Sequence, residues 1–391
     1  MIEVSFVNYM RDLLDLTPTS FHRYLYDEIN WESRLIGILG ARGVGKSTLI
    51  LQHIKAAANP EKHIYITAEN LWFSKHTLLE FADSFSNSGG EYLYIDEIHK
   101  YAGWSRELKL IYDLHPRLHV VFTGSSVLDI KKGESDLSRR AILYKLEGLS
   151  FREYIALRYG IKVPSYSLDE IIANKVDVAE LEYPLAVFKE YLATGYYPFF
   201  MHDNYLVRLS QIVVQTVESD IPIYAGMHVS TARKLRMLLS IICGIAPMKP
   251  NMSSLAQELD ASKNSIPDYL NYLESAGMIR LLRDDTKGLR SLGKVEKVYL
   301  DNTNLMYALA SSEPNVGNVR ETFFFNQMKV RNNVLASRIS DFSIGDMTFE
   351  VGGAKKGKKQ IASAQHGFVV KDDIRHGFGN VIPLWHFGMN Y

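Results

Sequence analysis

The sequence is poor in the features that mark several protein classes. It has one cysteine, Cys243, among its 391 residues, so no disulfide can form within the chain and a disulfide-stapled scaffold is excluded. Neither sign of charge is in excess, because 44 Lys and Arg balance 44 Asp and Glu, and no overall field draws the chain toward nucleic acid or membrane. The longest apolar run, near residues 237–248, is interrupted and too short to span a bilayer. The N-terminus lacks the order of a secretion signal, and we expect a cytoplasmic protein without a membrane contact.

What is present is an ordinary globular composition, with 47% hydrophobic and 23% charged residues. The length is too great for one compact core and predicts two to four domains. From about residue 30 to 148, apolar strands alternate with helical patterns, which predicts an α/β fold with a parallel sheet and helices on both faces. The first thirty residues are expected to form a helix packed on that core.

Residues 40–47 match the phosphate-binding pattern GxxxxGK[ST] in full. Its glycines allow a tight turn in which successive N–H groups face an anion, Lys46 can reach the β and γ phosphates, and the Ser47 hydroxyl can hold Mg²⁺. A short apolar strand at 34–39 precedes the loop and an amphipathic helix follows it, which is the context that the motif needs. The predicted nucleotide-binding residues are Gly40, Ala41, Arg42, Gly43, Val44, Gly45, Lys46, Ser47 and Thr48.

The second half of a nucleotide site follows about fifty residues later. Residues 92–97 read Tyr-Leu-Tyr-Ile-Asp-Glu, an apolar strand that ends in two acids. Asp96 can accept hydrogen bonds from the water shell of Mg²⁺, which prefers oxygen ligands. Glu97 is then placed to orient or deprotonate the attacking water as a catalytic residue. The predicted cofactors are ATP and Mg²⁺, with Ser47 and Asp96 at the metal and Lys46 also assisting catalysis.

Two further features have both a functional and a structural interpretation. A third strand, 119–126, ends in small hydroxyl residues, and Thr123, Ser125 or Ser126 could contact the γ-phosphate or the attacking water, with Ser125 preferred; a helix cap is the alternative. Arg139 and Arg140 could supply an arginine finger, from the same subunit or a neighbour, or could form exposed ion pairs.

Together the runs GARGVGKST, LYIDEIH, VVFTGSS and RRAILYKLEGLSFREYI resemble the prokaryotic AAA+-like ATPases of the archaeal-ATPase type. The resemblance covers the chain from about residue 30 to its C-terminus. It implies a P-loop NTPase core, a helical lid, a winged helix and a C-terminal α/β domain related to restriction-endonuclease-like nucleases. On this basis we predict an ATPase core at 1–150, a lid at 151–246, a winged helix-turn-helix at 247–290 and a degenerate nuclease-like domain at 291–391.

The predicted winged helix has a weak charge signature for DNA binding. From Ser253 to Arg283 it contains three basic and four acidic residues, whereas a helix-turn-helix that neutralises phosphates normally has a basic excess. A structural or protein-contact role is favoured over sequence-specific DNA recognition.

The last predicted domain contains most elements of a metal-dependent nuclease site. Glu321, Asp341 and Glu350 can fill the carboxylate positions, but glycine follows at residue 352, where such sites carry a lysine. Lys355 or Lys356 could substitute, or the site could be vestigial and serve binding or assembly. Residues 351–391 have six Lys and Arg against two Asp, and this basic excess favours DNA contact there.

These patterns predict an ATP-binding protein that hydrolyses ATP with Mg²⁺ and couples this to conformational change in the C-terminal domains. Two alternatives stay open: a slow nucleotide-dependent switch that binds a protein or DNA partner, and an active metal-dependent DNase. The sequence does not specify the partner or the oligomeric state.

Overall fold

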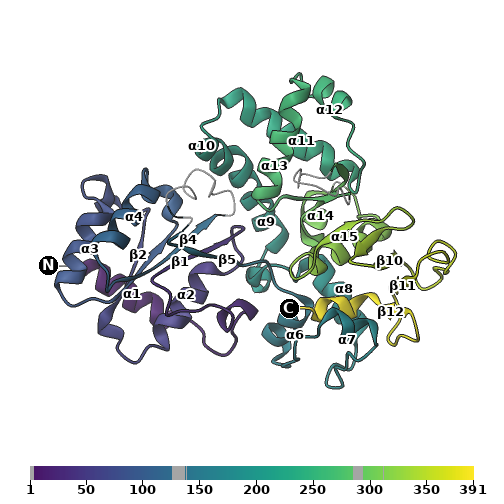
Figure 1. Cartoon of the computed structure of the whole chain (residues 1–391), viewed down its shortest axis with the longest axis horizontal. Coiled ribbons are helices and arrows are strands. Elements are labelled where there is room, and N and C mark those ends of the chain that lie inside the picture. Colours follow the sequence, from purple (N-terminus) through teal and green to yellow (C-terminus); the bar gives the residue numbers. More distant parts are fainter. Residues whose placement is uncertain (1–3, 126–136, 138, 285–293, 311) are drawn as a thin grey trace. The chain divides into compact units, whose positions relative to one another are not determined.

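The computed structural model describes residues 4–125, 137, 139–284, 294–310 and 312–391 (Figure 1). The chain divides into two compact units, Met1–Glu147 and Gly148–Tyr391. Each unit has its own sheet and its own buried core. The finer division into four domains stays a prediction.

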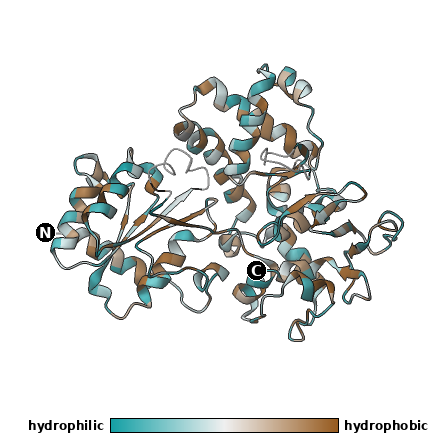
Figure 2. Cartoon of the chain, in the orientation of Figure 1, coloured by the Kyte–Doolittle hydropathy of each residue, from teal (hydrophilic) through white to brown (hydrophobic). Residues whose placement is uncertain are grey.

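The first unit is built on a five-stranded sheet with the order β2-β3-β4-β1-β5, in which every neighbouring pair is parallel. The parallel sheet predicted from the sequence is therefore confirmed. Every residue of β1 is buried, and Figure 2 shows hydrophobic colour running along this strand, as expected for a strand covered on both faces. The strands are β1 (Leu35–Gly40), β2 (His63–Thr67), β3 (Tyr92–Asp96), β4 (His119–Ser125) and β5 (Ile142–Lys145).

Helices cover both faces of this sheet. Figure 1 shows α1 and α2 on one face, with α3 and α4 on the other. The predicted N-terminal helix is present as α1, which contacts β2 and α2. Helix α3 begins with a capping box in which Thr77 and Glu80 each accept a hydrogen bond from the other's backbone N–H. The helices are α1 (Val4–Leu16), α2 (Lys46–Lys55), α3 (Leu78–Asn87) and α4 (Trp104–Leu114), with short 3₁₀ turns η1 (Tyr24–Tyr26), η2 (Pro60–Lys62), η3 (Leu71–Ser74) and η4 (Ile98–Lys100).

The second unit begins with a helical region. Helix α6 starts at a capping box between Ser150 and Glu153, and α9 runs into a single π-helical turn. The elements are α6 (Phe151–Tyr159), α7 (Leu168–Ile172), α8 (Pro184–Thr194), η5 (Pro198–Met201), α9 (Tyr205–Gln215), η6 (Thr216–Asp220), α10 (Ile221–Ala225) and α11 (Val229–Ile245). Helices α6, α7 and α8 all contact η8 (Leu384–Met389), near the C-terminus of the chain. The first part of the predicted lid thus packs on residues that are distant in sequence, and the lid as a separate domain stays a prediction.

Residues 247–300 contain two helices followed by an antiparallel strand pair. Asp260 and Gly277 both have positive φ angles, 46° and 71°, and mark the turns after the two helices. The elements are α12 (Met252–Glu258), η7 (Lys263–Ser265), α13 (Ile266–Ser275), β6 (Ile279–Arg283) and β7 (Val295–Leu300). The winged helix as a fold stays a prediction, and its residues 285–290 lie outside the described part of the chain.

The C-terminal region forms a mixed sheet with the order β12-β11-β10-β9-β8. Strands β10, β11 and β12 are parallel, and β8 and β9 are antiparallel to their neighbours. Helix α15 packs on β10 and on η8. The elements are α14 (Thr303–Leu309), α15 (Val316–Met328), β8 (Val334–Ala336), β9 (Phe342–Ile344), β10 (Met347–Gly352), β11 (His366–Lys371) and β12 (Val381–Pro383).

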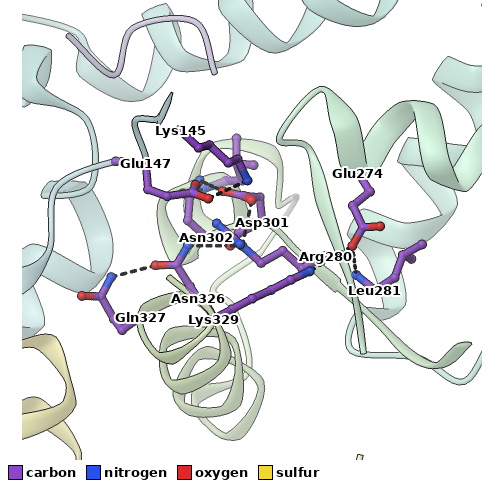
Figure 3. A network of polar contacts seen from close by, with 12 residues as sticks. Lys145, Glu147, Glu274, Arg280, Leu281, Asp301, Asn302, Asn326, Gln327 and Lys329 are labelled. Atoms are coloured by element: carbon purple, nitrogen blue, oxygen red, sulfur yellow. Dashed lines mark hydrogen bonds and ion pairs between the residues drawn. The ribbon is translucent and has the colours of Figure 1, made fainter. Parts of the chain in front are cut away.

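Ion pairs and amide hydrogen bonds tie these elements together. Arg280 of β6 pairs with Asp301 at 2.9 Å between Nε and Oδ1, and both side chains are buried. Figure 3 shows this pair beside the Asn326–Gln327 contact of α15, with the Glu274 carboxylate facing the Leu281 N–H. A buried pair of this kind is costly to break, since removing one partner leaves the other charged and unpaired.

Candidate nucleotide-binding and catalytic site

The loop between β1 and α2 is shaped by its glycines. Gly43 and Gly45 have φ angles of 84° and 98°, a backbone region that residues with a Cβ rarely adopt. Gly40 is required for a different reason: a Cβ there would lie 2.4 Å from the Leu146 carbonyl oxygen. The loop can therefore close tightly ahead of the N-terminus of α2, where backbone N–H groups favour an anion.

Lys46 is the first residue of α2, and its side chain folds back into the loop. It is 5% exposed, and its Nζ donates to Gly40 O at 2.9 Å and to Ala41 O at 3.1 Å. The ammonium group is held inside the loop that the sequence predicts for the phosphates. Its charge is available there to offset phosphate charge.

The two sequence motifs meet through a hydrogen bond between Ser47 and Asp96. The Ser47 hydroxyl donates to Asp96 Oδ2 at 2.6 Å, and Asp96 is the last residue of β3. A hydroxyl that donates its proton in this way keeps its oxygen lone pairs for another partner.

Asp96 accepts hydrogen bonds from three further donors. The Tyr65 hydroxyl donates to Oδ2 at 2.5 Å, the Glu97 N–H donates to Oδ1 at 3.1 Å, and the Thr123 hydroxyl also donates to Oδ1. Burial and the Asp96 carboxylate raise the pKa of Tyr65 well above its usual value, so its hydroxyl remains a donor. Strands β2, β3 and β4 thus each contribute a side chain to one carboxylate cluster.

Glu97 follows Asp96 in a left-handed backbone conformation, with φ of 52°. Its N–H also donates to Thr123 Oγ1 at 3.0 Å, and its Oε2 lies 3.2 Å from Nε2 of His99. Burial raises the pKa of Glu97, an effect that the nearby Lys46 and Arg42 oppose. A carboxylate with a raised pKa is a better proton acceptor than a solvated one, which suits activation of water.

The end of β4 supplies Thr123 to this cluster. Ser125 is buried two residues later, where it pairs in register with Gly40 of β1. Ser126 lies outside the described residues. The sequence alone preferred Ser125 among the three, whereas the contact with Asp96 is made by Thr123; the role of either hydroxyl at a nucleotide stays a prediction.

The two arginines after β4 have different surroundings. Arg140 forms a bidentate pair with Asp113 of α4, with Nε–Oδ1 and Nη2–Oδ2 distances of 3.0 and 3.1 Å. Arg139 is exposed. The Asp113 pair agrees with the alternative interpretation of Arg140 as a residue that forms an ion pair. A role as an arginine finger stays a prediction for both arginines.

Sequence reasoning did not identify Arg23, Tyr65 or His99. Arg23 precedes η1 and is 5% exposed; its guanidinium donates to Val44 O in the phosphate loop at 2.5 Å and to Glu147 O at 2.7 Å. No sequence pattern around Arg23 predicts its contact with the phosphate loop. Tyr65 had one signal, its place two residues before the end of the strand that neighbours β3.

The residues at this site fit Mg²⁺ and a nucleotide phosphate. Ser47 and Asp96 present hard oxygen atoms side by side, next to a loop that holds a buried ammonium. Among the described residues no group of three or more His, Cys, Asp or Glu is placed to hold a metal ion. Mg²⁺ at a nucleotide is typically held by one or two protein groups together with phosphate and water.

A second cluster gathers the residues predicted for a vestigial nuclease site. Lys297 Nζ lies 3.0 Å from Glu321 Oε2 and 3.8 Å from Asp341 Oδ1, and the Tyr299 hydroxyl also donates to Glu321. Lys356 pairs with Glu350, which is 1% exposed. The structure therefore brings these carboxylates into one region, each with a lysine partner. Lys355 is exposed.

Asp341 and Lys297 line a cavity of about 790 Å³ that also includes Lys249 and Arg338. Burial, followed by repulsion from Glu321, raises the pKa of Asp341 to about 6, although the Val351 N–H and Lys297 oppose the shift. Because an ammonium group already bridges two carboxylates, the cluster does not fit a divalent cation as it stands.

Comparison with known proteins identifies two family matches. Residues 32–155 match a family described as an AAA domain, and residues 185–315 match a domain of unknown function, DUF8612. The second match crosses two predicted boundaries, the one between lid and winged helix and the one between winged helix and nuclease-like domain. An uncharacterized protein of Methanocaldococcus jannaschii is 26% identical over 285 residues, which cover 68% of this chain and 59% of that protein.

Solved structures give weaker similarity. The S. cerevisiae Hsp104–ADP complex has a TM-score of 0.35 and 14% identity, over 66% of this chain and 51% of that chain. AMPPCP-bound DnaA from Aquifex aeolicus has a TM-score of 0.28 and 14% identity, over 70% of this chain and 89% of that chain.

No helix in the described ranges is long and apolar enough to cross a membrane. The AAA domain match and the parallel sheet together support a P-loop ATPase fold for the first unit.

Proposed function

We propose that the first unit binds ATP and hydrolyses it in the presence of Mg²⁺. The observation that carries the proposal is the Ser47–Asp96 hydrogen bond, which joins the phosphate loop to the acidic end of β3. A glycine-rich turn or an acidic strand end is common by itself, but the two in contact have the layout that phosphoryl transfer needs.

Each residue has a distinct part in this proposal. The loop N–H groups and Lys46 bind the phosphates, and Ser47 and Asp96 would hold Mg²⁺, which supplies charge neutralisation at the phosphates when bound. Glu97 accepts a proton from the attacking water, or orients it, from a half-buried position with a raised pKa. Thr123 fixes the Glu97 backbone and the Asp96 carboxylate together.

We further propose that the nucleotide state alters the conformation of the second unit, with its predicted winged-helix and nuclease-like domains. The support is the presence of a second family match, at residues 185–315, after the AAA domain match in the sequence. The alternative is a slow switch in which bound nucleotide controls a protein or DNA partner and turnover is incidental.

The predicted winged helix favours a protein-contact role over DNA reading. Two of its three basic residues are engaged internally, because Arg280 pairs with Asp301 and Arg283 Nη2 donates to Glu274 at 2.9 Å. If DNA is bound, the basic stretch at 351–391 is the better candidate. Its Lys355 and Lys359 are exposed.

The first experiment is Mg²⁺-ATP hydrolysis by the full chain, with and without double-stranded DNA, in wild type and Glu97→Gln. We expect nucleotide binding in both proteins and a turnover lower by at least about a hundredfold in the variant, as for loss of a catalytic base. Glu69→Gln is the matched control, since it removes an exposed carboxylate near Glu97. Tight binding with negligible wild-type turnover would instead favour the switch, and absence of nucleotide binding would contradict the proposal.

Metal-dependent DNA cleavage is the less favoured candidate. The gathering of Glu321, Asp341 and Glu350 supports it, whereas the Lys297 bridge and the Lys356–Glu350 pair argue against a free metal position. We expect no cleavage of double-stranded DNA with Mg²⁺ or Mn²⁺. Cleavage that is lost in both Asp341→Ala and Glu350→Ala would reverse this ranking.

A further inference from the structure

Tyr65 contributes to the nucleotide site from a strand that carries neither motif. It lies in β2 at 3% exposure, and its backbone pairs in register with Tyr94 of β3. Thr67, two residues later and on the same face of β2, pairs with Asp96. The tyrosine side chain therefore only needs to extend along the sheet to reach the carboxylate, and its hydroxyl lies 2.5 Å from Asp96 Oδ2.

The hydroxyl completes the set of donors around Asp96. Ser47 and Tyr65 both donate to Oδ2, while Thr123 and the Glu97 N–H both donate to Oδ1. Each oxygen of the carboxylate is therefore held by two protein donors, which leaves the carboxylate little freedom to turn. The terminal torsion of an aspartate is soft, and its orientation is decided by such partners.

Without the Tyr65 hydroxyl, this set would leave Oδ2 with Ser47 as its donor. The carboxylate could then turn away from the position in which it takes the Ser47 proton. The Ser47 oxygen would no longer present its lone pairs in a fixed direction, and that direction is what a metal ion at the phosphates requires. Partners that orient metal-binding groups typically change metal affinity by about 10- to 100-fold when they are removed.

The packing of Tyr65 supports a fixed position. Its ring lies 6.3 Å from the ring of Tyr9 in α1, which covers the sheet on that face. Close packing around a buried ring restricts its conformation, so the fold sets the position of the Tyr65 hydroxyl before a nucleotide binds.

We propose that Tyr65 is a positioning residue for Mg²⁺-dependent nucleotide binding, acting through Asp96 on Ser47. The inference rests on the proposed function, because it assigns Tyr65 a role in the same site. Tyr65 should therefore increase the affinity for the nucleotide when Mg²⁺ is bound with it, and should have little effect on the affinity when the nucleotide binds alone.

The test is binding of a non-hydrolysable ATP analogue to the full chain by calorimetry, across a Mg²⁺ titration and in EDTA. For Tyr65→Phe we expect the Mg²⁺ concentration at half-maximal binding to rise by about tenfold or more. Affinity in EDTA should stay within about twofold of wild type. Tyr94→Phe is the matched control: it removes a fully buried hydroxyl from the register partner, where the contact is His63 Nδ1 at 3.1 Å. It should leave both quantities unchanged.

The outcomes distinguish the role of Tyr65 from the function of the site. Wild-type Mg²⁺ dependence in Tyr65→Phe would overturn the role of Tyr65 and leave the proposed function standing. Equal losses with Mg²⁺ and in EDTA would show a general structural role and also overturn it. Absence of analogue binding by the wild type at every Mg²⁺ concentration would overturn the proposed function, and this inference with it.

Discussion

Ser47 Oγ and Asp96 Oδ2 are 2.6 Å apart, although 49 positions separate the two residues in the chain. The strand order explains how this contact forms. Strand β4 lies between β1, which leads into the phosphate loop, and β3, which ends at Asp96. All three strands are parallel, so their carboxyl ends meet at one edge of the sheet, where open α/β folds bind ligands. The contacts at this edge, and the charged clusters of the second unit, can be tested one residue at a time.

Lys46→Ala should weaken ATP binding by about a hundredfold, because a charged hydrogen-bond donor to phosphate contributes up to about 3 kcal/mol. Calorimetry with Mg²⁺-ATP measures this directly. Lys75→Ala, at an exposed lysine of the same unit, serves as the control and should bind as wild type does. Unchanged affinity in Lys46→Ala would remove the phosphate loop from the site.

Gly40→Ala should lower both nucleotide affinity and stability, since its Cβ would meet the Leu146 carbonyl oxygen at 2.4 Å and the backbone must shift. Overpacking of this kind costs about 1–3 kcal/mol. Thermal melting with and without ATP gives both quantities. Gly244→Ala is a contrasting control inside helix α11, because a Cβ there meets no atom within 4 Å and should be neutral or slightly stabilising.

Thr123→Val should slow ATP hydrolysis by at least about tenfold, because it removes the hydroxyl that contacts both Asp96 and the Glu97 N–H. Thr123→Ser keeps the hydroxyl and should retain most of the turnover. Steady-state rates of these two variants and of Ser125→Ala distinguish the candidate hydroxyls. A larger loss in Ser125→Ala than in Thr123→Val would restore Ser125 as the preferred residue.

Glu274→Gln should destabilise the second unit by about 3 kcal/mol at pH 7. Burial alone would raise the pKa of Glu274, but Lys329, Arg283 and the Leu281 N–H lower it to about 2. A lowered carboxylate pKa stabilises the fold above the unfolded value near 4.5, and this stabilisation is lost as the pH falls from there through about 2. Urea unfolding at pH 7, 4 and 3 should show the difference from wild type shrinking below pH 4.5; a constant difference would contradict the ion-pair explanation.

Asp341→Asn should change stability in the opposite direction to Glu274→Gln. The pKa of Asp341 is raised from 3.8 to about 6, so the charged form costs stability in full above about pH 6, and the cost disappears as the pH falls toward 3.8. The variant should therefore gain stability over wild type, by about 3 kcal/mol at pH 7 and by little at pH 4. Unfolding curves at the two pH values measure the gain. A loss of stability at pH 7 would show that the pairing with Lys297 outweighs burial.

The parts of the site that were predictable are those encoded locally. The phosphate loop is a run of eight residues whose glycines and lysine each have a backbone or charge reason to be there, and β3 is an apolar run that ends in acids. Helix α13 likewise has local signals at its two ends, with Pro267 in its first turn and Gly277, at a positive φ angle, after its last turn.

Contacts set by strand order or by long-range packing could not be predicted. Tyr65 faces Asp96 because β2 lies beside β3, and nothing in the sequence around Tyr65 states that order. The three basic residues counted in the predicted winged helix included Arg280 and Arg283, which the structure pairs with Asp301 and Glu274. A charge count treats such residues as available to a partner, whereas only tertiary structure shows that they are engaged.

Arg23 has a practical consequence for any shortened version of this protein. Its guanidinium donates both to Val44 in the phosphate loop and to Glu147, after the last strand of the sheet. A fragment that starts at β1 would contain every recognisable nucleotide motif but would lack Arg23. The carbonyl oxygens of Val44 and Glu147 would then have to accept hydrogen bonds from water. The residues ahead of the sheet act as a foundation for the loop, and a fragment chosen by motif boundaries alone would be expected to fold with its ligand-facing end loosened.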